Sequence, residues 1–173
     1  IEERLSNENL TFAPEAALRT LARRAALVLT GLPPNPNDVA TLVSSKNPNA
    51  YEAFVDSLLA SERYGEHRAR YWLDAVRYGD TGGLARDTRR GLYPYRDWVI
   101  KALNEDLPYD RFARMQIAGD VLEPGKDDGT AAVGFLVAGV HNTVLGSDER
   151  EKRKARADEL EEMVSTMSQA FLG

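Results

Sequence analysis

Apolar residues recur at every third or fourth position in one segment of the chain after another. The clearest stripe lies between residues 48 and 60 and consists of Tyr51, Phe54, Val55, Leu58 and Leu59. Such spacing places the apolar side chains on one face of a helix, and that face is stable only when other helices cover it. We therefore expect an all-α fold, a single domain of about seven to eight orthogonally packed helices with long, functional-looking loops over residues 1–173.

Turn and capping residues divide this pattern into separate helices. Proline and glycine seldom continue a helix, whereas serine and asparagine often cap its start. Asn35, Ser61 and Ser147 are each placed to cap a helix. The expected helices cover Pro14–Leu29, a segment from Pro36, Pro48–Ala60, 62–79, a segment from Pro94, a segment from Pro108 to Gly119, and a last helix after Ser147. Residues 130–138 are apolar on all sides, so their pattern fits a strand as well as a buried helix.

The charge and the missing residue types limit the function. With 22 basic and 27 acidic residues the chain has a net charge of −5, which argues against nucleic-acid binding. No apolar run reaches the ~18 residues of a membrane-spanning helix, so we expect no membrane span. The lack of cysteine excludes disulfides, thiolate ligands and a thiol nucleophile within this chain. Because there are only two histidines, a zinc site would depend on carboxylates, and we predict no metal site.

The segment 77–97 carries the best candidates for a functional site. It lacks helical spacing between 80 and 93, and long loops inside a compact domain are often functional. Its aspartates could act as a general acid and base, its arginines could grip a carboxylate, a sulfate or a haem propionate, and Gly82 and Gly83 would let the backbone approach a ligand. Alternatively, the aspartates and arginines pair with one another and only fix the loop. The candidate ligand-binding residues are Arg77, Asp80, Asp87, Arg96 and Asp97, together with His141 in a second loop.

The aromatic residues allow two interpretations. Trp72 and Trp98 could stack on a carbohydrate, but both fall on apolar stripes, which favours a place in the core. Trp72 shares its predicted face with Tyr64, Tyr71 and Ala75. His67 precedes Tyr71 by one turn, and we expect it to be at least half-buried.

The chain ends in another amphipathic stripe, formed by Leu160, Met163, Val164, Met167 and Phe171. We expect Met163, Val164, Met167 and Phe171 to be buried against other helices or to form a sticky patch. The strongly charged residues 149–162 are predicted to form the solvated face of this helix. The stripe is still running at Gly173, which raises the question whether the chain is a piece of something larger.

Several sequence blocks together resemble one family. The blocks are "LTGLPPNPNDV", "YEAFVDSLLASERYGEHRARYWLDAVRYGDT", "YPYRDWVIKALNEDLPYDRF", "QIAGDVL" and "RADELEEMVSTMSQAFLG". From about Leu18 to Gly173 the chain resembles the planctomycete cytochrome-c-type domain of unknown function. In that family the "AFLG" block is followed by Cys-x-x-Cys-His, the motif for covalent haem attachment. This chain differs where relatives often have a histidine before Trp-Leu-Asp, since that position is Tyr71 here, and a tryptophan common near His67 is also absent.

The resemblance implies an exported protein, periplasmic or extracellular, in a redox or electron-transfer setting. This chain would be its helical module, either a fragment of a larger multidomain protein or a member that has lost the haem segment. It would bind no haem covalently, whereas the full-length protein could carry haem c. Its partners would be neighbouring domains of the same polypeptide, with a redox protein or a glycan as further candidates. Two alternatives stay open, a hydrolase-like or binding domain for an anionic or sulfated glycan and a non-catalytic scaffold, so the sequence does not decide whether the chain is an enzyme.

Overall fold

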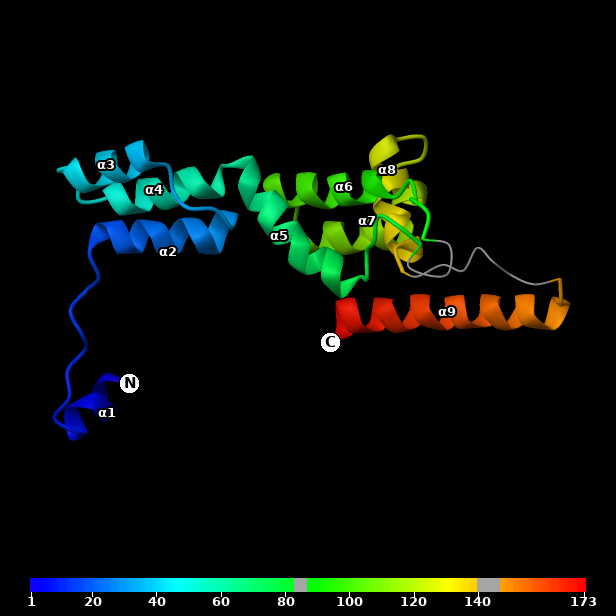
Figure 1. Cartoon of the computed structure of the whole chain (residues 1–173), viewed down its shortest axis with the longest axis horizontal. Helices are drawn as coiled ribbons and strands as arrows, with labels where there is room; N and C mark the ends of the chain where they lie inside the picture. The colour runs from blue at the N-terminus through cyan, green and yellow to red at the C-terminus, as the bar shows by residue number, and fades with distance from the viewer. Residues whose placement is uncertain (83–86, 140–146) are drawn as a thin grey trace. The chain divides into compact units, whose positions relative to one another are not determined.

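The computed structural model describes residues 1–82, 87–139 and 147–173, and within them the chain is all-α, as predicted (Figure 1). Strand-like pairing in this part is limited to one antiparallel bridge between Thr81 and Arg89. Among the described helices, none combines the length and the apolar content needed to cross a membrane. The helices are α1 (Glu2–Asn7), α2 (Leu18–Thr30), α3 (Pro36–Ser44), α4 (Ala50–Leu59), α5 (Glu62–Ala75), α6 (Tyr93–Asn104), α7 (Tyr109–Leu122), α8 (Asp127–Ala132), the 3-10 helix η1 (Val133–Val137) and α9 (Glu149–Leu172).

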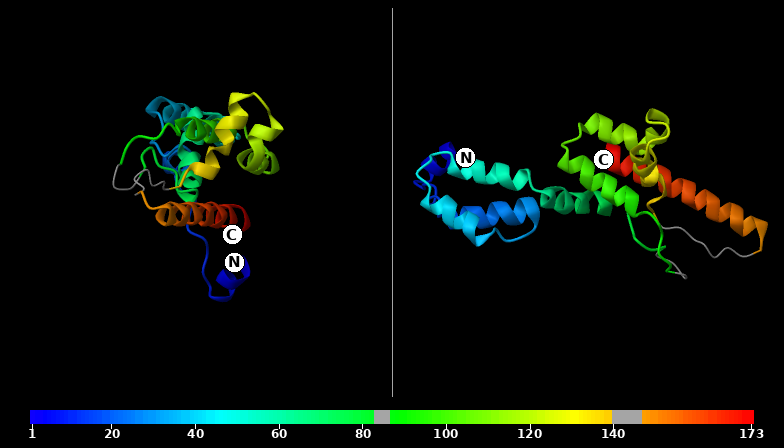
Figure 2. Two further views of the ribbon diagram at one scale, coloured as in Figure 1. Left: turned by 90° about the vertical axis from the view of Figure 1, so that its right-hand side faces the viewer. Right: turned by 90° about the horizontal axis from the view of Figure 1, so that it is seen from above.

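The chain divides into two compact units, Ile1–Leu59 and Ala60–Gly173. In the first unit α2, α3 and α4 pack against one another (Figure 2). Their contact faces form a small core of Ala22, Val39, Leu42 and Phe54. That the whole chain is a single domain stays a prediction.

The second unit contains the larger core. Trp98 from α6 stacks on Phe112 from α7, with ring centroids 5.3 Å apart and planes 12° from parallel. Both rings are buried, which confirms that Trp98 belongs to the core. The other buried apolar residues of this core are Ala69, Val76, Tyr95, Val99, Ala102, Met115, Ala132, Phe135 and Ala138.

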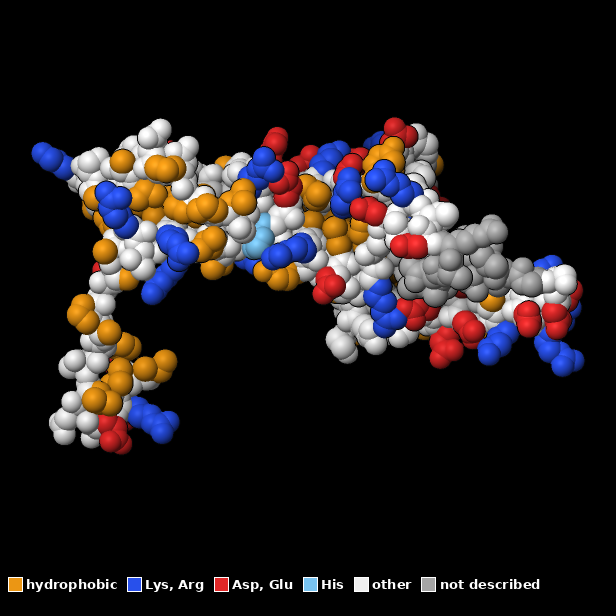
Figure 3. Space-filling view, in the orientation of Figure 1, with side chains coloured by type: hydrophobic (Ala, Val, Ile, Leu, Met, Phe, Trp, Pro, Cys, Tyr) orange, Lys and Arg blue, Asp and Glu red, His pale blue; other side chains and the backbone are white. Residues whose placement is uncertain are grey.

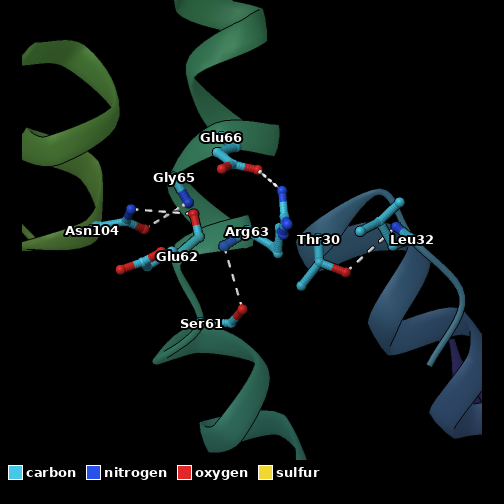
Figure 4. Close-up of polar contacts among 8 residues, drawn as sticks. All are labelled: Thr30, Leu32, Ser61, Glu62, Arg63, Gly65, Glu66 and Asn104. Carbon is cyan, nitrogen blue, oxygen red and sulfur yellow. Dashed lines mark hydrogen bonds and ion pairs between the residues drawn. The ribbon is translucent and has the colours of Figure 1, made fainter. Parts of the chain in front are cut away.

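A glycine lets α5 and α6 approach closely. The backbone N–H of Gly65 donates to Asn104 Oδ1 at 2.8 Å, and Asn104 Nδ2 donates to the Glu62 carbonyl at 3.2 Å (Figure 4). A Cβ atom on Gly65 would stand 2.6 Å from the carbonyl oxygen of Ile100, which is closer than side chains tolerate. The buried face of α5 therefore runs through small residues.

The predicted face of α5 is partly wrong for this reason. Gly65, Ala69 and Val76 are buried and Trp72 is half-buried, whereas Tyr71 and Ala75 point to solvent. The stripe in the sequence followed the large side chains, but the close helix contact selects the small ones.

Most helix boundaries agree with the sequence to within a few residues. Asn35 and Ser61 cap their helices, since each side chain accepts a hydrogen bond from the N–H two residues later, at 2.9 and 3.3 Å. Helix α2 begins at Leu18 rather than Pro14 and ends before Gly31, whose φ of 70° suits glycine. The cap of α9 is Asp148 and not Ser147, because Asp148 Oδ1 accepts from the N–H of Arg150 at 2.8 Å.

Two segments behave differently from the prediction. Helix α7 continues past Gly119 to Leu122, but a kink at Ala118 (φ −147°, ψ 34°) falls beside the predicted end. The segment 130–138, whose pattern fitted either a strand or a helix, is helical: it contains the end of α8 and the 3-10 helix η1.

Helix α9 buries one narrow face. Met163, Met167 and Phe171 are half-buried, and the latter two pack against the larger core. Val164 is 64% exposed and so is not buried in this unit, which leaves for it the predicted alternative of an exposed apolar patch. Thr166, which is buried, takes the central place on that face. Basic and acidic side chains lie mixed along the outside of α9, as predicted (Figure 3).

Candidate functional site

Three of the predicted site residues meet at the start of α6. The guanidinium of Arg96 donates through Nε and Nη2 to Asp97 Oδ1, at 3.0 and 2.9 Å. Its Nη1 lies 3.6 Å from Asp80 Oδ1. All three side chains are more than a third exposed, so these ion pairs are screened by water and contribute about 0–1 kcal/mol each.

Backbone hydrogen bonds bring Asp80 to this place. The two arms of the loop pair at Thr81 and Arg89, and the N–H of Arg90 donates to the Asp80 carbonyl at 2.8 Å. Asp87 lies on the returning arm, next to Thr88, whose carbonyl accepts from the N–H of Gly82 at 3.0 Å. Residues 83–86, which include the predicted Gly83, lie outside the described part of the chain.

Tyr78 also belongs to this cluster, although it was not among the predicted ligand-binding residues. Its hydroxyl donates to Asp80 Oδ1 at 2.6 Å. Burial, reinforced by the hydrogen bond and the negative charge of Asp80, raises the pKa of Tyr78 to about 12. The hydrogen bond to Asp97 raises the pKa of Arg96. At neutral pH the cluster therefore combines a phenol donor, a fixed cation and two carboxylates.

Arg77 does not join this cluster. The residue follows the end of α5 with a φ of 57°, and this turn directs its guanidinium to α9. There it forms an ion pair with Glu162 and donates to Gln169 Oε1 at 3.5 Å. Arg77 thus ties α9 to α5 instead of facing Arg96.

His141, the remaining predicted residue, lies outside the described residues. Within the described ones, no group of three or more histidine, aspartate or glutamate side chains is arranged to hold a metal ion.

Arg90 is a second residue that sequence reasoning missed. Its Nη1 and Nη2 donate to the carbonyls of Gly139 and Val137, at 2.5 and 2.6 Å. These bonds fix the returning arm of the loop to the segment after η1. No spacing in the sequence signals this contact, because it joins two irregular segments.

A buried polar network lies under the site. Trp72 Nε1 donates to Gln116 Oε1 at 2.8 Å and contacts the Tyr95 hydroxyl at 3.1 Å. The Tyr95 hydroxyl donates to the same Gln116 oxygen at 2.7 Å, and burial raises the pKa of Tyr95. Gln116 Nε2 donates to the Phe112 carbonyl at 3.2 Å. The sequence could have indicated this network, because Gln116 shares an apolar helical face with Phe112 and Gly119. A polar side chain on such a face needs a hydrogen-bond partner in the core.

A cleft of about 690 Å³ joins this site to the surface of α5. Its lining combines two tyrosines, two arginines and two carboxylates: Tyr71, Tyr78, Arg70, Arg96, Glu66 and Asp74. The cleft can accommodate a polar ligand that offers acceptors to the arginines and a flat face to the tyrosines.

Comparison with known proteins identifies the family without adding an activity. No curated protein and no solved structure matches the chain. A family model described as PSCyt2, a protein of unknown function (DUF1549), matches residues 1–173. The match covers the whole chain, and the chain therefore belongs to this PSCyt2 family of proteins of unknown function.

Proposed function

We propose that this chain is a helical module of a larger, exported, haem-associated protein of planctomycete type. Its role would be to frame the haem-bearing segment in a redox or electron-transfer setting, without attaching haem through its own residues. The family membership and the resemblance of the "AFLG" block to sequences that precede a haem attachment motif support this proposal. The lack of cysteine agrees with it, because c-type attachment uses cysteine thiols.

The observation that carries the proposal is the anchoring of the last turns of α9. The Phe171 ring lies 5.5 Å from the Trp72 ring and 5.2 Å from the Phe135 ring. One turn earlier Met167 packs against the same core, and Glu162 is paired with Arg77. A segment attached after this helix would begin at a fixed point beside the core. A group that transfers electrons must be held at a defined position, and a fixed attachment point at the end of α9 would provide this.

The test is a longer chain of the same gene, extended by the ~20 residues in which the attachment motif is expected, and produced with a haem-attachment system. We expect a haem absorbance band that survives denaturation in the longer chain and none in residues 1–173. In the longer chain, Phe171→Ala should keep the haem but broaden or shift its reduction potential, whereas Val164→Ala, at an exposed position of the same helix, should leave the potential unchanged. A longer chain that lacks the motif or carries no haem would overturn the proposal.

A second candidate function is binding of an anionic or sulfated glycan in the cleft beside Arg96. The pairing of two arginines with two tyrosines in one cleft favours it. Titration with a sulfated disaccharide should show binding that Arg96→Ala abolishes with little change in melting temperature, because its ion pairs are exposed. Wild-type binding in Arg96→Ala would show that the cluster only clamps the loop.

A further inference from the structure

A separate pocket of about 380 Å³ opens between α5 and the turn that joins α6 to α7. Half of its ten lining residues are aromatic, and none of the ten was a predicted ligand-binding residue. Volume and lining are typical of a small-molecule site, which combines an apolar body with a few polar groups. The residues that matter are Trp72, Phe112, Tyr71, Tyr109, Arg68 and Asp106.

The aromatic part of the pocket is held rigid from behind. Trp72 and Phe112 meet edge to face, with centroids 5.0 Å apart and planes at 68°. The indole N–H of Trp72 is engaged by Gln116 and Tyr95, so the indole cannot rotate without breaking buried hydrogen bonds. A ligand ring would therefore meet a surface that is already ordered, which lowers the entropic cost of binding. Tyr71 and Tyr109 are more than half exposed, so both remain accessible beside it.

Arg68 provides the positive charge in the lining of this pocket. Its guanidinium lies over the Tyr64 ring, 5.7 Å from the centroid. In the part of the chain that the structure describes, it forms no ion pair with a carboxylate. An arginine held by its face against a ring keeps its N–H edge available, and that edge matches a carboxylate with two parallel hydrogen bonds.

Asp106 limits which anion the pocket accepts. It follows α6 with a φ of 48°, and this left-handed residue ends the helix, since the N–H groups of Asp106 and Leu107 donate to the carbonyls of Leu103 and Ala102 at 3.3 and 2.9 Å. Its negative charge lies in the same pocket as Arg68 and disfavours a second negative charge on a ligand. The pocket therefore favours a monoanion.

We propose that this pocket binds a small monocarboxylate with an aromatic or similarly flat ring. The ring contacts Trp72 and Phe112 between the exposed tyrosines, and the carboxylate pairs with Arg68. This inference goes beyond the haem-associated role and does not depend on it. It needs only the residues of the unit Ala60–Gly173.

The test is a titration of the full chain with phenylacetate, monitored by NMR at the indole N–H of Trp72. We expect a saturable shift in the wild type, and affinity at least about tenfold weaker in Arg68→Gln, because a hydrogen bond to a charged group is worth about 1.5–3 kcal/mol. Arg63→Gln is the matched control, since it removes the same charge from the same helix, but Arg63 pairs with Glu66 and lines neither this pocket nor the cleft beside Arg96. Its affinity should stay within about twofold of the wild type.

Two further probes separate charge from ring binding. Benzyl alcohol lacks the carboxylate and phenylmalonate carries two, so both should bind more weakly than phenylacetate. Unchanged binding of phenylacetate to Arg68→Gln, equal weakening in Arg63→Gln, or no saturable shift of Trp72 in the wild type would each overturn the proposal. The unperturbed Trp72 resonance of each free variant verifies that it is folded.

Discussion

At the scale of single residues, Gln116 lies at the centre of the buried polar network. It is completely buried, and its Oε1 accepts hydrogen bonds from both Trp72 and Tyr95. Gln116→Leu preserves much of the volume but leaves the Tyr95 hydroxyl without its acceptor in the core. A buried polar group that loses its partner costs about 1–3 kcal/mol, so the free energy of unfolding in urea should fall by that amount.

Gln169→Leu is the matched control for this substitution, because Gln169 is exposed and its contact with Arg77 is long, at 3.5 Å. It should change the free energy of unfolding by less than about 0.5 kcal/mol. If Gln116→Leu were as stable as Gln169→Leu, the buried network would not contribute to folding.

The raised pKa of Tyr78 should make the free energy of unfolding depend on pH under alkaline conditions. Its pKa is raised to about 12 in the folded chain, against about 10 for a free tyrosine. The folded state thus holds this proton more tightly, so the stabilisation is complete below pH ~10 and is lost as the pH rises from ~10 through ~12. Tyr78→Phe should flatten the decline of the unfolding free energy in that window. Tyr93→Phe, at an exposed tyrosine, should follow the wild type, and equal slopes in all three proteins would contradict the role of Asp80 and burial.

The site residues show what sequence reasoning can reach. Arg96, Asp97 and Asp80 were predicted because charged residues cluster around one loop, and the structure does bring these three together. The direction of Arg77 was not predictable, because it depends on one left-handed residue after α5. Nor could the pocket at Arg68 be foreseen, since it needs α5 and the α6–α7 turn in contact.

At the scale of secondary-structure elements, the contact between α5 and α6 depends on Gly65. Gly65→Ala would place a methyl group against the backbone of α6, which cannot move as a side chain can. Forcing two packed helices apart typically costs about 1–3 kcal/mol. Thermal unfolding of Gly65→Ala should therefore show a clearly lower midpoint than that of the wild type.

Gly91→Ala provides the comparison, because a Cβ atom there would meet nothing within 4 Å. Its melting temperature should equal that of the wild type or lie slightly above it. A Gly65→Ala variant that melts together with Gly91→Ala would show that α5 and α6 are less tightly packed than the structure indicates.

Helix existence was predictable, but the buried faces were less so. Periodicity and turn residues located most helices, because each helix must bury an apolar stripe somewhere. The faces of α5 and α9 departed from their stripes, since Ala69 and Thr166 are buried while Tyr71 and Val164 are exposed. Which side chain is covered depends on how closely the partner helix approaches, and local spacing contains no information about that distance.

At the scale of the whole molecule, each of the two units has its own buried core. The core of Ile1–Leu59 is built around Phe54, and that of Ala60–Gly173 around Trp98 and Phe112. From the sequence we expected a single domain of packed helices. Core membership depends on contacts between distant segments, which explains why the two clusters were not visible in the sequence.

This division can be tested because both tryptophans lie in the second unit, whereas helices occur in both. Tryptophan fluorescence therefore follows the unfolding of Ala60–Gly173, and far-ultraviolet circular dichroism follows the whole chain.

Phe54→Ala removes a buried ring from the small core, a loss of about 3–5 kcal/mol for that unit. We expect it to shift the first part of the dichroism transition to lower urea while the fluorescence midpoint stays in place. Phe112→Ala, the corresponding change in the large core, should lower the fluorescence midpoint. If Phe54→Ala instead moves both probes by the same amount, the chain unfolds as one cooperative domain, since two independently stable cores would not share a transition.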